Sequence, residues 1–570
     1  EYETAKQKMK DNSILKISFS KVKSLNEKLI LLKDPSKNAP SYIEDLSGIN
    51  LIITNKNKRE SVKVDVVSLR DNTIKLKLIS SINISINETT TAELVVNNPF
   101  FLIKKLINEF HKLEITDDYN HKEEAEEDIE FIFGPPGTGK TTEIANRINQ
   151  SINEGKKKIL ILTPTNKSAD VLCRKIISKA NSNFSDWLIR FGNTSMMDDQ
   201  MQSIVKDREF DIDELESFVV VSTIVRLPYD GFLNIKLNEI QWDEVYFDES
   251  SMIHLSYAAY AMKKLNSNKL FFAGDPNQIT PIMQYQDWEK QNIYEMFELS
   301  DFEDPTTKPK NFPVKTLNTQ YRSLKDIGDL FSYYAYSGKV DSHKSITERK
   351  SLSFANEDLK PFTIMRFPIS NYERLLKRAR LIHSPYQIYA AIYCIEIAKY
   401  ISDKINLEWP DKSDKKIIED DLDIDSLNES KWTIGIICPY KAQSSIIERL
   451  IPERKNDDKF IIISGTVHSF QGDECDIVIS LFNPPPSISP FISLNNKNIM
   501  NVSISRAKQY QILIAPDEDT RMYEDLEEIN EIVNIIKKSY PDGYDEIDSD
   551  KMEEILFGEK EYIRNNSIVT

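Results

Sequence analysis

The stretch that decides the fold is Gly134-Pro135-Pro136-Gly137-Thr138-Gly139-Lys140-Thr141. Its spacing fits the phosphate-binding loop pattern G-x-x-x-x-G-K-[ST] in full. The apolar run Ile129–Phe133 precedes the loop, and the helical stretch Thr142–Asn153 follows it. A strand, a loop and a helix in this order are the context that the pattern requires. We therefore predict a site for nucleotide phosphates in an α/β domain.

The residues of this loop are of the types that bind phosphate. Backbone N–H groups at the N-terminus of a helix form an anion site, so 134–139 and Thr142 are expected to surround the phosphates. Lys140 adds a positive charge, and the Thr141 hydroxyl is a ligand for Mg²⁺. Three of the chain's 15 glycines fall in this loop, which argues against an ordinary flexible turn. The predicted cofactors are ATP and Mg²⁺.

A second motif supplies the acidic groups that a phosphate loop needs. Asp248 and Glu249 follow directly after the strand pattern Glu244–Phe247. On its own, an Asp-Glu pair after a strand is more often a helix cap. Because this pair follows a phosphate loop in the same α/β series, we predict that Asp248 binds Mg²⁺. Glu249 is then expected to be the general base for the attacking water.

Strand patterns alternate with helical stretches in two successive parts of the chain. Such alternation predicts βαβ units and parallel sheets. The predicted fold class is α/β, with two tandem parallel-sheet domains, an N-terminal β-rich domain and a C-terminal acidic helical tail. The predicted boundaries are 1–99 for the barrel-like accessory domain, 100–300 and 314–516 for the two α/β domains, 301–313 for a linker and 517–570 for the tail.

The expected elements follow from apolar periodicity. Strands of the first sheet are expected at Ile129–Phe133, Ile159–Leu162, Phe218–Val221, Glu244–Phe247 and Leu270–Ala273. Strands of the second sheet are expected at Thr363–Phe367, Ile434–Cys438, Ile461–Gly465, Ile477–Leu481 and Gln511–Ala515. The N-terminal strands are expected at Ile14–Phe19, Val62–Leu69, Thr73–Ile79 and Ala92–Val96. Helices are expected at Phe100–Leu113 and Met522–Lys538, and Pro410–Lys431 is expected to be an exposed insertion.

Further motifs follow in a fixed order along the chain. They are Gly274-Asp275-Pro276-Asn277-Gln278, Leu317-Asn318-Thr319-Gln320-Tyr321-Arg322, Cys438-Pro439-Tyr440, Ser469-Phe470-Gln471-Gly472-Asp473-Glu474 and Asn501-Val502-Ser503-Ile504-Ser505-Arg506-Ala507-Lys508. Together with the first two motifs, this order resembles superfamily 1 helicases. The resemblance is to the 5′→3′ group that contains the nonsense-mediated-decay RNA helicase and senataxin. It covers Phe100 to Pro516 and implies two RecA-like domains that hydrolyse ATP between them.

The resemblance also implies roles for single residues. The implied nucleotide contacts are Gln278 as the sensor of the γ-phosphate, Tyr321 as the ring that stacks on adenine, Arg322 and Arg506 as arginine fingers, and Gly472 and Glu474 as further nucleotide contacts. An arginine outside such a motif is more often part of a surface salt bridge. Because both arginines belong to the second predicted domain, closure of the two domains would complete the site.

Small polar residues at strand ends are expected to hold a single strand of DNA or RNA by its backbone. The implied contacts are Pro164, Thr165, Asn166, Ser222, Thr223, Pro439, Tyr440, Thr466 and His468. Ordinary loop capping is the alternative for each of them. A basic helical face is also predicted from Arg374, Lys377, Arg378 and Arg380. Most such faces are merely solvated, so contact with nucleic acid is the weaker reading of this one.

Composition sets limits on the class of protein. The net charge is −17, but 517–570 holds 17 acidic and 6 basic residues, so much of the excess lies in the predicted tail. Nucleic-acid binding depends on local positive grooves, so this charge does not exclude it. No apolar run is long enough for a membrane span. The four cysteines are dispersed, which predicts a reducing, cytoplasmic setting without disulfides or a zinc module.

The sequence leaves several alternatives open. No glutamine occurs between Gln7 and Gln150, where relatives carry the residue that selects adenine, so relaxed discrimination between ATP and GTP is expected. The leading function is a 5′→3′ translocating helicase. The alternatives are an ATPase that remodels protein–nucleic-acid complexes without unwinding, and a regulatory motor subunit of a larger assembly such as a bacterial defence complex. The N-terminal domain or the acidic tail is a candidate site for a protein partner.

Overall fold

The structure is a computed structural model of the chain. It describes residues 14–26, 28–36, 43, 46, 49–56, 58–69, 73–97, 100–113, 128–180, 183–194, 198–281, 292–299, 312–347, 359–367, 379–381, 384–412, 431–452, 458–470, 472–483, 493–517, 524–560, 562 and 565. The chain forms two compact units. The first comprises Glu1–Gly134, Gly139–Pro276 and Thr280–Leu317, and the second comprises Pro135–Thr138, Asn277–Ile279 and Asn318–Thr570.

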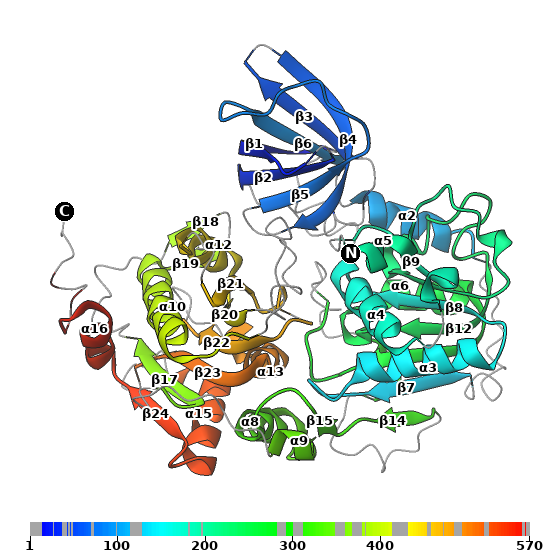
Figure 1. Cartoon of the computed structure of the whole chain (residues 1–570). Coiled ribbons are helices and arrows are strands. Elements are labelled where there is room, and N and C mark those ends of the chain that lie inside the picture. Colours follow the sequence, from blue (N-terminus) through cyan, green and yellow to red (C-terminus); the bar gives the residue numbers. More distant parts are fainter. Residues whose placement is uncertain are drawn as a thin grey trace. The chain divides into compact units, whose positions relative to one another are not determined.

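The first unit begins with a closed antiparallel barrel (Figure 1). The strands follow the ring order β1 (Ile14–Ser24), β2 (Leu29–Pro35), β5 (Thr73–Leu78), β4 (Lys58–Leu69), β3 (Ile49–Asn55) and β6 (Thr91–Asn97). Alternate side chains face inward, so Ile17 and Phe19 are buried while Lys16 and Ser18 are exposed. The predicted barrel-like domain is confirmed, although β2 and β3 were not predicted.

The rest of the first unit is a parallel sheet (Figure 1). Its order is β10 (Val205–Lys206), β9 (Leu188–Phe191), β11 (Phe218–Thr223), β8 (Lys158–Thr163), β12 (Gln241–Phe247), β13 (Asn266–Gly274), β7 (Ile129–Phe133) and β14 (Val314–Thr316). Helices α3 (Lys140–Glu154) and α4 (Asn166–Lys179) lie side by side and share a hydrophobic core with the strands. All five predicted strands are present. The predicted boundary at Val314 is wrong, because β14 pairs with β7 of the first sheet.

The second unit contains a parallel sheet of its own. Its order is β21 (Phe460–Thr466), β20 (Trp432–Cys438), β22 (Cys475–Leu481), β23 (Ala507–Pro516), β17 (Phe362–Phe367) and β24 (Tyr544–Ile547). Helix α10 (Ile388–Glu408) packs on α12 (Lys441–Leu450), and α8 (Lys325–Tyr336) packs on α13 (Lys497–Ile504) and α15 (Glu527–Ser539). The five predicted strands are all present here too.

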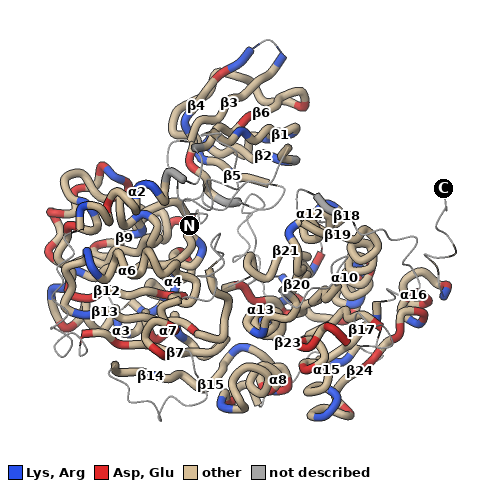
Figure 2. Tube along the Cα trace, turned by 180° about the vertical axis from the view of Figure 1, so that it is seen from behind, with Lys and Arg blue, Asp and Glu red and all other residues tan. Residues whose placement is uncertain are grey.

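The prediction of a separate helical tail needs correction. Strand β24 lies within 517–570 and pairs in parallel with β17, so this segment completes the second sheet. Helix α15 packs on α8, and α16 (Ser549–Phe557) contacts β17. Acidic residues lie along α15, β24 and α16 (Figure 2). The acid-rich composition suggested a solvated tail, but Ile529, Ile532 and Ile536 give α15 a buried face.

Shorter elements complete the two units. They are α2 (Phe100–Phe110), α5 (Asp199–Ile204), α6 (Leu255–Lys264), α7 (Ile293–Met296), β15 (Thr319–Gln320), β16 (Asp341–Ser342), α9 (Lys344–Thr347), β18 (Ala379–Leu381) and β19 (Ser384–Tyr386). Most of the predicted linker and of the insertion after Pro410 lies outside the described residues. Within the described part of the chain, no helix has the length and apolar character of a membrane span. All four cysteines are described, buried and free of disulfides.

Candidate functional site

The phosphate loop connects the buried strand β7 to helix α3. Gly137 and Gly139 have φ angles of 73° and 90°, in the left-handed region that glycine adopts without strain. Helix α3 begins at Lys140, and its N-cap is Gly139, which has no side chain to cap the first N–H groups of the helix. The Lys140 ammonium is buried and donates to the Gly134 carbonyl over 2.6 Å. The lysine therefore lies folded back over its own loop, as expected of a cation that neutralises phosphate.

The two predicted acids lie where β12 ends. Asp248 is buried, and one of its oxygens accepts from the Glu249 backbone N–H over 2.9 Å. Glu249 has φ 48° and ψ 45°, a left-handed conformation that non-glycine residues rarely adopt. One Glu249 carboxylate oxygen, Oε2, is buried without a hydrogen-bond partner. A strained backbone and an unsatisfied carboxylate are typical of a functional site, because ordinary folding does not favour either of them.

The charges of the loop and of the acids act on one another within the first unit. Burial raises the pKa of Asp248 to about 7, and the charge of Glu249 adds to this rise. The Lys140 ammonium and the hydrogen bond from Glu249 oppose it. A divalent cation beside Asp248 would favour the carboxylate in the same way. The chemistry of the site therefore fits Mg²⁺. No cluster of three His, Cys, Asp or Glu side chains that could hold a metal occurs in the described ranges, and a nucleotide-bound Mg²⁺ does not need one.

Close packing fixes the loops after β12 and β13. The Ser250 hydroxyl donates to the Ala273 carbonyl over 2.9 Å and shares a hydrogen bond of 2.7 Å with the Tyr294 hydroxyl. The Gly134 N–H donates to the Gly274 carbonyl over 3.1 Å. Strands β12, β13 and β7 are neighbours in the sheet, and a predicted motif lies at the end of each strand. The three motifs therefore lie at one edge of the sheet. Gln278 follows β13 and is buried.

We expect Gly274→Ala to destabilise the first unit. A Cβ at this position would lie 2.5 Å from the Tyr294 hydroxyl and 3.0 Å from the Ser250 backbone nitrogen. The expected loss is about 1–3 kcal/mol, measured by urea unfolding. The matched control is Gly155→Ala, because a Cβ there meets no atom within 4 Å. Equal stabilities of the two variants would contradict the proposed close packing.

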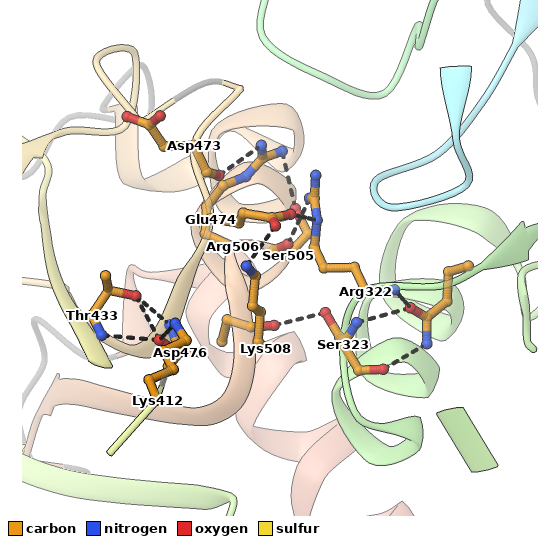
Figure 3. Close-up of polar contacts among 12 residues, drawn as sticks. Arg322, Ser323, Lys412, Thr433, Asp473, Glu474, Asp476, Ser505, Arg506 and Lys508 are labelled. Carbon is orange, nitrogen blue, oxygen red and sulfur yellow. Dashed lines mark hydrogen bonds and ion pairs between the residues drawn. The ribbon is translucent and has the colours of Figure 1, made fainter. Parts of the chain in front are cut away.

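The second unit places two cations, the predicted Arg322 and also Lys508, around Glu474 (Figure 3). Arg322 Nε lies 2.5 Å from Glu474 Oε2, and Lys508 Nζ lies 2.6 Å from Oε1. Burial alone would raise the pKa of Glu474, but Arg322 and Lys508 lower it to about 2. The Glu474 carboxylate is therefore ionised throughout the physiological range. Its bridging role and the participation of Lys508 were not predicted.

Arg506 lies in the same part of the unit but in a different setting. Its guanidinium is buried and donates to the Val502 carbonyl oxygen over 3.2 Å. It also donates to the Asp473 carbonyl oxygen over 3.4 Å (Figure 3). Tyr321 is exposed, and its ring lies 4.6 Å from that of His343. Gly472 is exposed with φ 85°. The structure thus brings Arg322, Arg506 and Glu474 together, while their action on nucleotide stays a prediction.

The predicted strand-binding residues of the first unit have structural partners. Thr165 caps α4, because its hydroxyl accepts from the Ser168 N–H over 3.1 Å. Asn166 is buried, and its Oδ1 accepts from Arg190 over 2.9 Å. Pro164 lies between them and β8. Thr165 therefore acts as an ordinary helix cap, which was the alternative expectation for this residue. Capping does not prevent its contact with a phosphate.

The remaining predicted contacts also follow strand ends. Ser222 and Thr223 end β11, and both are fully buried. Pro439 and Tyr440 follow β20 and are partly buried. Thr466 ends β21, and burial lowers the pKa of the nearby His468. The predicted basic helical face needs correction: Arg380 lies in strand β18, while Arg374, Lys377 and Arg378 fall outside the described residues.

A buried arginine that we did not predict holds one of these loops in place. Arg190 Nε donates to Asp170 Oδ1 over 2.7 Å, and its Nη2 also donates to the Asn193 carbonyl over 2.6 Å. The second Asp170 oxygen accepts from the Thr194 hydroxyl over 2.8 Å. Both charged side chains are fully buried. With Asn166, this network joins the start of α4 to the end of β9.

Two protein-family models, each described as an AAA domain, match residues 120–284 and 297–518. Among curated proteins, DNA polymerase alpha-associated DNA helicase A of Saccharomyces cerevisiae is 24% identical over 450 residues, which cover 68% of this chain and 62% of that protein. Putative helicase mov-10-B.2 of Danio rerio is 26% identical over 420 residues, covering 67% and 39%. DNA replication ATP-dependent helicase/nuclease dna2 of Schizosaccharomyces pombe is 25% identical over 402 residues, covering 67% and 26%.

These matches confirm the resemblance that the order of motifs predicts. Residues 120–284 and 297–518 match models of AAA domains, and about two thirds of the chain is similar to proteins named as helicases. It spans between 26% and 62% of the length of the three relatives named above.

Proposed function

We propose that this chain is an ATP-dependent motor that moves 5′→3′ along single-stranded nucleic acid and unwinds duplexes ahead of it. Its two parallel sheets would act as tandem RecA-like domains that hydrolyse ATP between them. The observation that carries the proposal is the meeting of the buried Lys140 with Asp248 and Glu249 at one edge of the first sheet. Matches to helicases over two thirds of the chain support the same reading.

Each of these side chains would have its own role in ATP hydrolysis. Lys140 and the loop N–H groups would hold the phosphates, and the unsatisfied Glu249 oxygen would accept a proton from the attacking water. Arg322 and Arg506 would stabilise the charge that develops on the γ-phosphate, with Gln278 positioned to sense its presence. Thr141 and Asp248 would hold Mg²⁺, which supplies further charge neutralisation when it is bound.

Nucleotide selection would rest on Tyr321, a residue that is 53% exposed and whose ring can stack on a base. Stacking is nearly independent of purine identity, because every purine offers a similar aromatic face. Discrimination between ATP and GTP would then be weak. The strand ends that carry Thr165, Asn166, Ser222 and Thr223 would hold the nucleic-acid backbone without reading its sequence.

ATP hydrolysis by the purified chain tests the proposal. We expect single-stranded DNA or RNA to stimulate the rate, and GTP to be hydrolysed at a rate similar to that of ATP. Duplexes with either a 5′ or a 3′ single-stranded tail then separate the two polarities. Displacement only from a 5′ tail is expected. Stimulation without displacement would favour remodelling of protein–nucleic-acid complexes, and a rate that nucleic acid leaves unchanged would contradict the motor.

A further inference from the structure

One carboxylate in the second unit serves two cations from different segments of the chain. Glu474 directly precedes β22, Arg322 follows β15, and Lys508 lies at the start of β23 (Figure 3). Each Glu474 oxygen has its own cation, Arg322 at 2.5 Å and Lys508 at 2.6 Å. Side-chain exposure is 17% for Arg322, 26% for Lys508 and 37% for Glu474, so water screens each pair in part.

The backbones of Arg322 and Lys508 are tied to each other. The Ser323 hydroxyl donates to the Ala507 carbonyl over 2.7 Å, and the Leu324 N–H donates to the Lys508 carbonyl over 2.9 Å. Buried Gln320 accepts from the Arg322 N–H over 2.8 Å. Because these bonds fix both backbones to the start of one strand, Arg322 can leave Glu474 by moving its side chain alone.

The Arg322 guanidinium cannot pair fully with the Glu474 carboxylate and with a phosphate at the same time. If Arg322 turned to a γ-phosphate, Glu474 would lose one of its two cations while remaining partly buried. An unpaired carboxylate in such a place is unfavourable, and it would hold the arginine back. Lys508 is bound to the other oxygen, so Glu474 would stay paired after Arg322 leaves. Arg506 donates to the Val502 backbone carbonyl in the same region.

We propose that Lys508 is a positioning residue that lets Arg322 exchange the Glu474 carboxylate for the γ-phosphate of ATP. Glu474 would orient the arginine while the site waits for nucleotide, and Lys508 would keep Glu474 neutralised once the arginine has moved. This proposal rests on the proposed function, because it assigns a resting partner to one of the arginine fingers. It gives Lys508 a role in hydrolysis without any contact with the nucleotide.

The test compares Lys508→Met with Lys508→Arg in the full chain. Methionine is unbranched and reaches as far as the lysine Cε, but it carries no charge, so Arg322 would stay on Glu474. The kcat of nucleic-acid-stimulated ATP hydrolysis should then fall by roughly tenfold or more, with the KM for ATP much less affected. Lys508→Arg keeps a cation and should retain most of the wild-type kcat. Thermal unfolding of both variants shows whether either has lost its fold.

A second substitution distinguishes this mechanism from general damage. In the variant that combines Lys508→Met with Glu474→Gln, no carboxylate competes for Arg322, so kcat should return to that of Glu474→Gln alone. Binding of ADP with aluminium fluoride, relative to ADP, reports on the arginine without turnover. Lys508→Met should weaken the binding of ADP with aluminium fluoride much more than the binding of ADP alone. A wild-type kcat in folded Lys508→Met, or independent losses in the double variant, would overturn the role of Lys508 and leave the motor intact. An inactive wild type would overturn both.

Discussion

Replacing Glu249 with glutamine should lower the kcat of ATP hydrolysis by roughly 10²–10⁴-fold, the range expected when a general base is removed. The amide keeps the shape of the side chain, but it cannot take a proton from water. Binding of ATP should stay close to that of the wild type, because Lys140 and the loop N–H groups are unchanged. Steady-state hydrolysis and equilibrium binding of a fluorescent ATP analogue measure the two effects separately.

The chain offers a matched control for this variant. Glu298 is also a glutamate with a left-handed backbone, at φ 55°, but its side chain is exposed and follows the short helix α7. Glu298→Gln should leave kcat within about twofold of the wild type, since surface substitutions away from a site have small effects. Turnover that survives in Glu249→Gln would mean that another group takes the proton from water.

The order of the elements could be predicted because the buried strands of a parallel sheet are nearly continuous apolar runs. β8, β11 and β22 are fully or almost fully buried, and each was expected close to its actual bounds. The elements that were missed lack this signal. β14 has three residues, and β24, Tyr544–Ile547, reads as polar and acidic although it joins the second sheet. Their pairing depends on contacts that are distant in sequence.

The candidate site was predictable where a motif lies in one loop. Lys140, Asp248 and Glu249 follow single strands, and their spacing is visible in the sequence. The Glu474 bridge was not predictable, because Arg322, Glu474 and Lys508 come from three segments that only the fold brings together. Thr165 shows a different limit. A hydroxyl that caps a helix and one that contacts a phosphate have the same sequence signature, since both occur where a strand passes into a helix.

The Arg190 network ties the start of α4, directly after the loop that follows β8, to the end of β9. Its guanidinium donates to Asp170 and Asn166 on α4 and to the Asn193 carbonyl beyond β9, without exposure to water. A buried arginine and aspartate stabilise little as a pair, but each is strongly unfavourable without the other. The loop that carries Pro164 and Thr165 therefore depends on a charge pair that no solvent can replace.

Arg190→Met should accordingly destabilise the first unit by about 3–5 kcal/mol, because Asp170 would be left buried without its cation. Arg174→Met is the matched control: Arg174 on α4 pairs over 2.9 Å with Asp198, the N-cap of α5, but the two side chains are 31% and 38% exposed. That substitution should change stability by no more than about 1 kcal/mol. Urea unfolding measures both variants. At urea concentrations below the unfolding transition, nucleic-acid affinity should fall in Arg190→Met but not in Arg174→Met, because Asn166 loses its hydrogen bond from Arg190. Equal effects of the two substitutions would show that the buried network does not hold the loop.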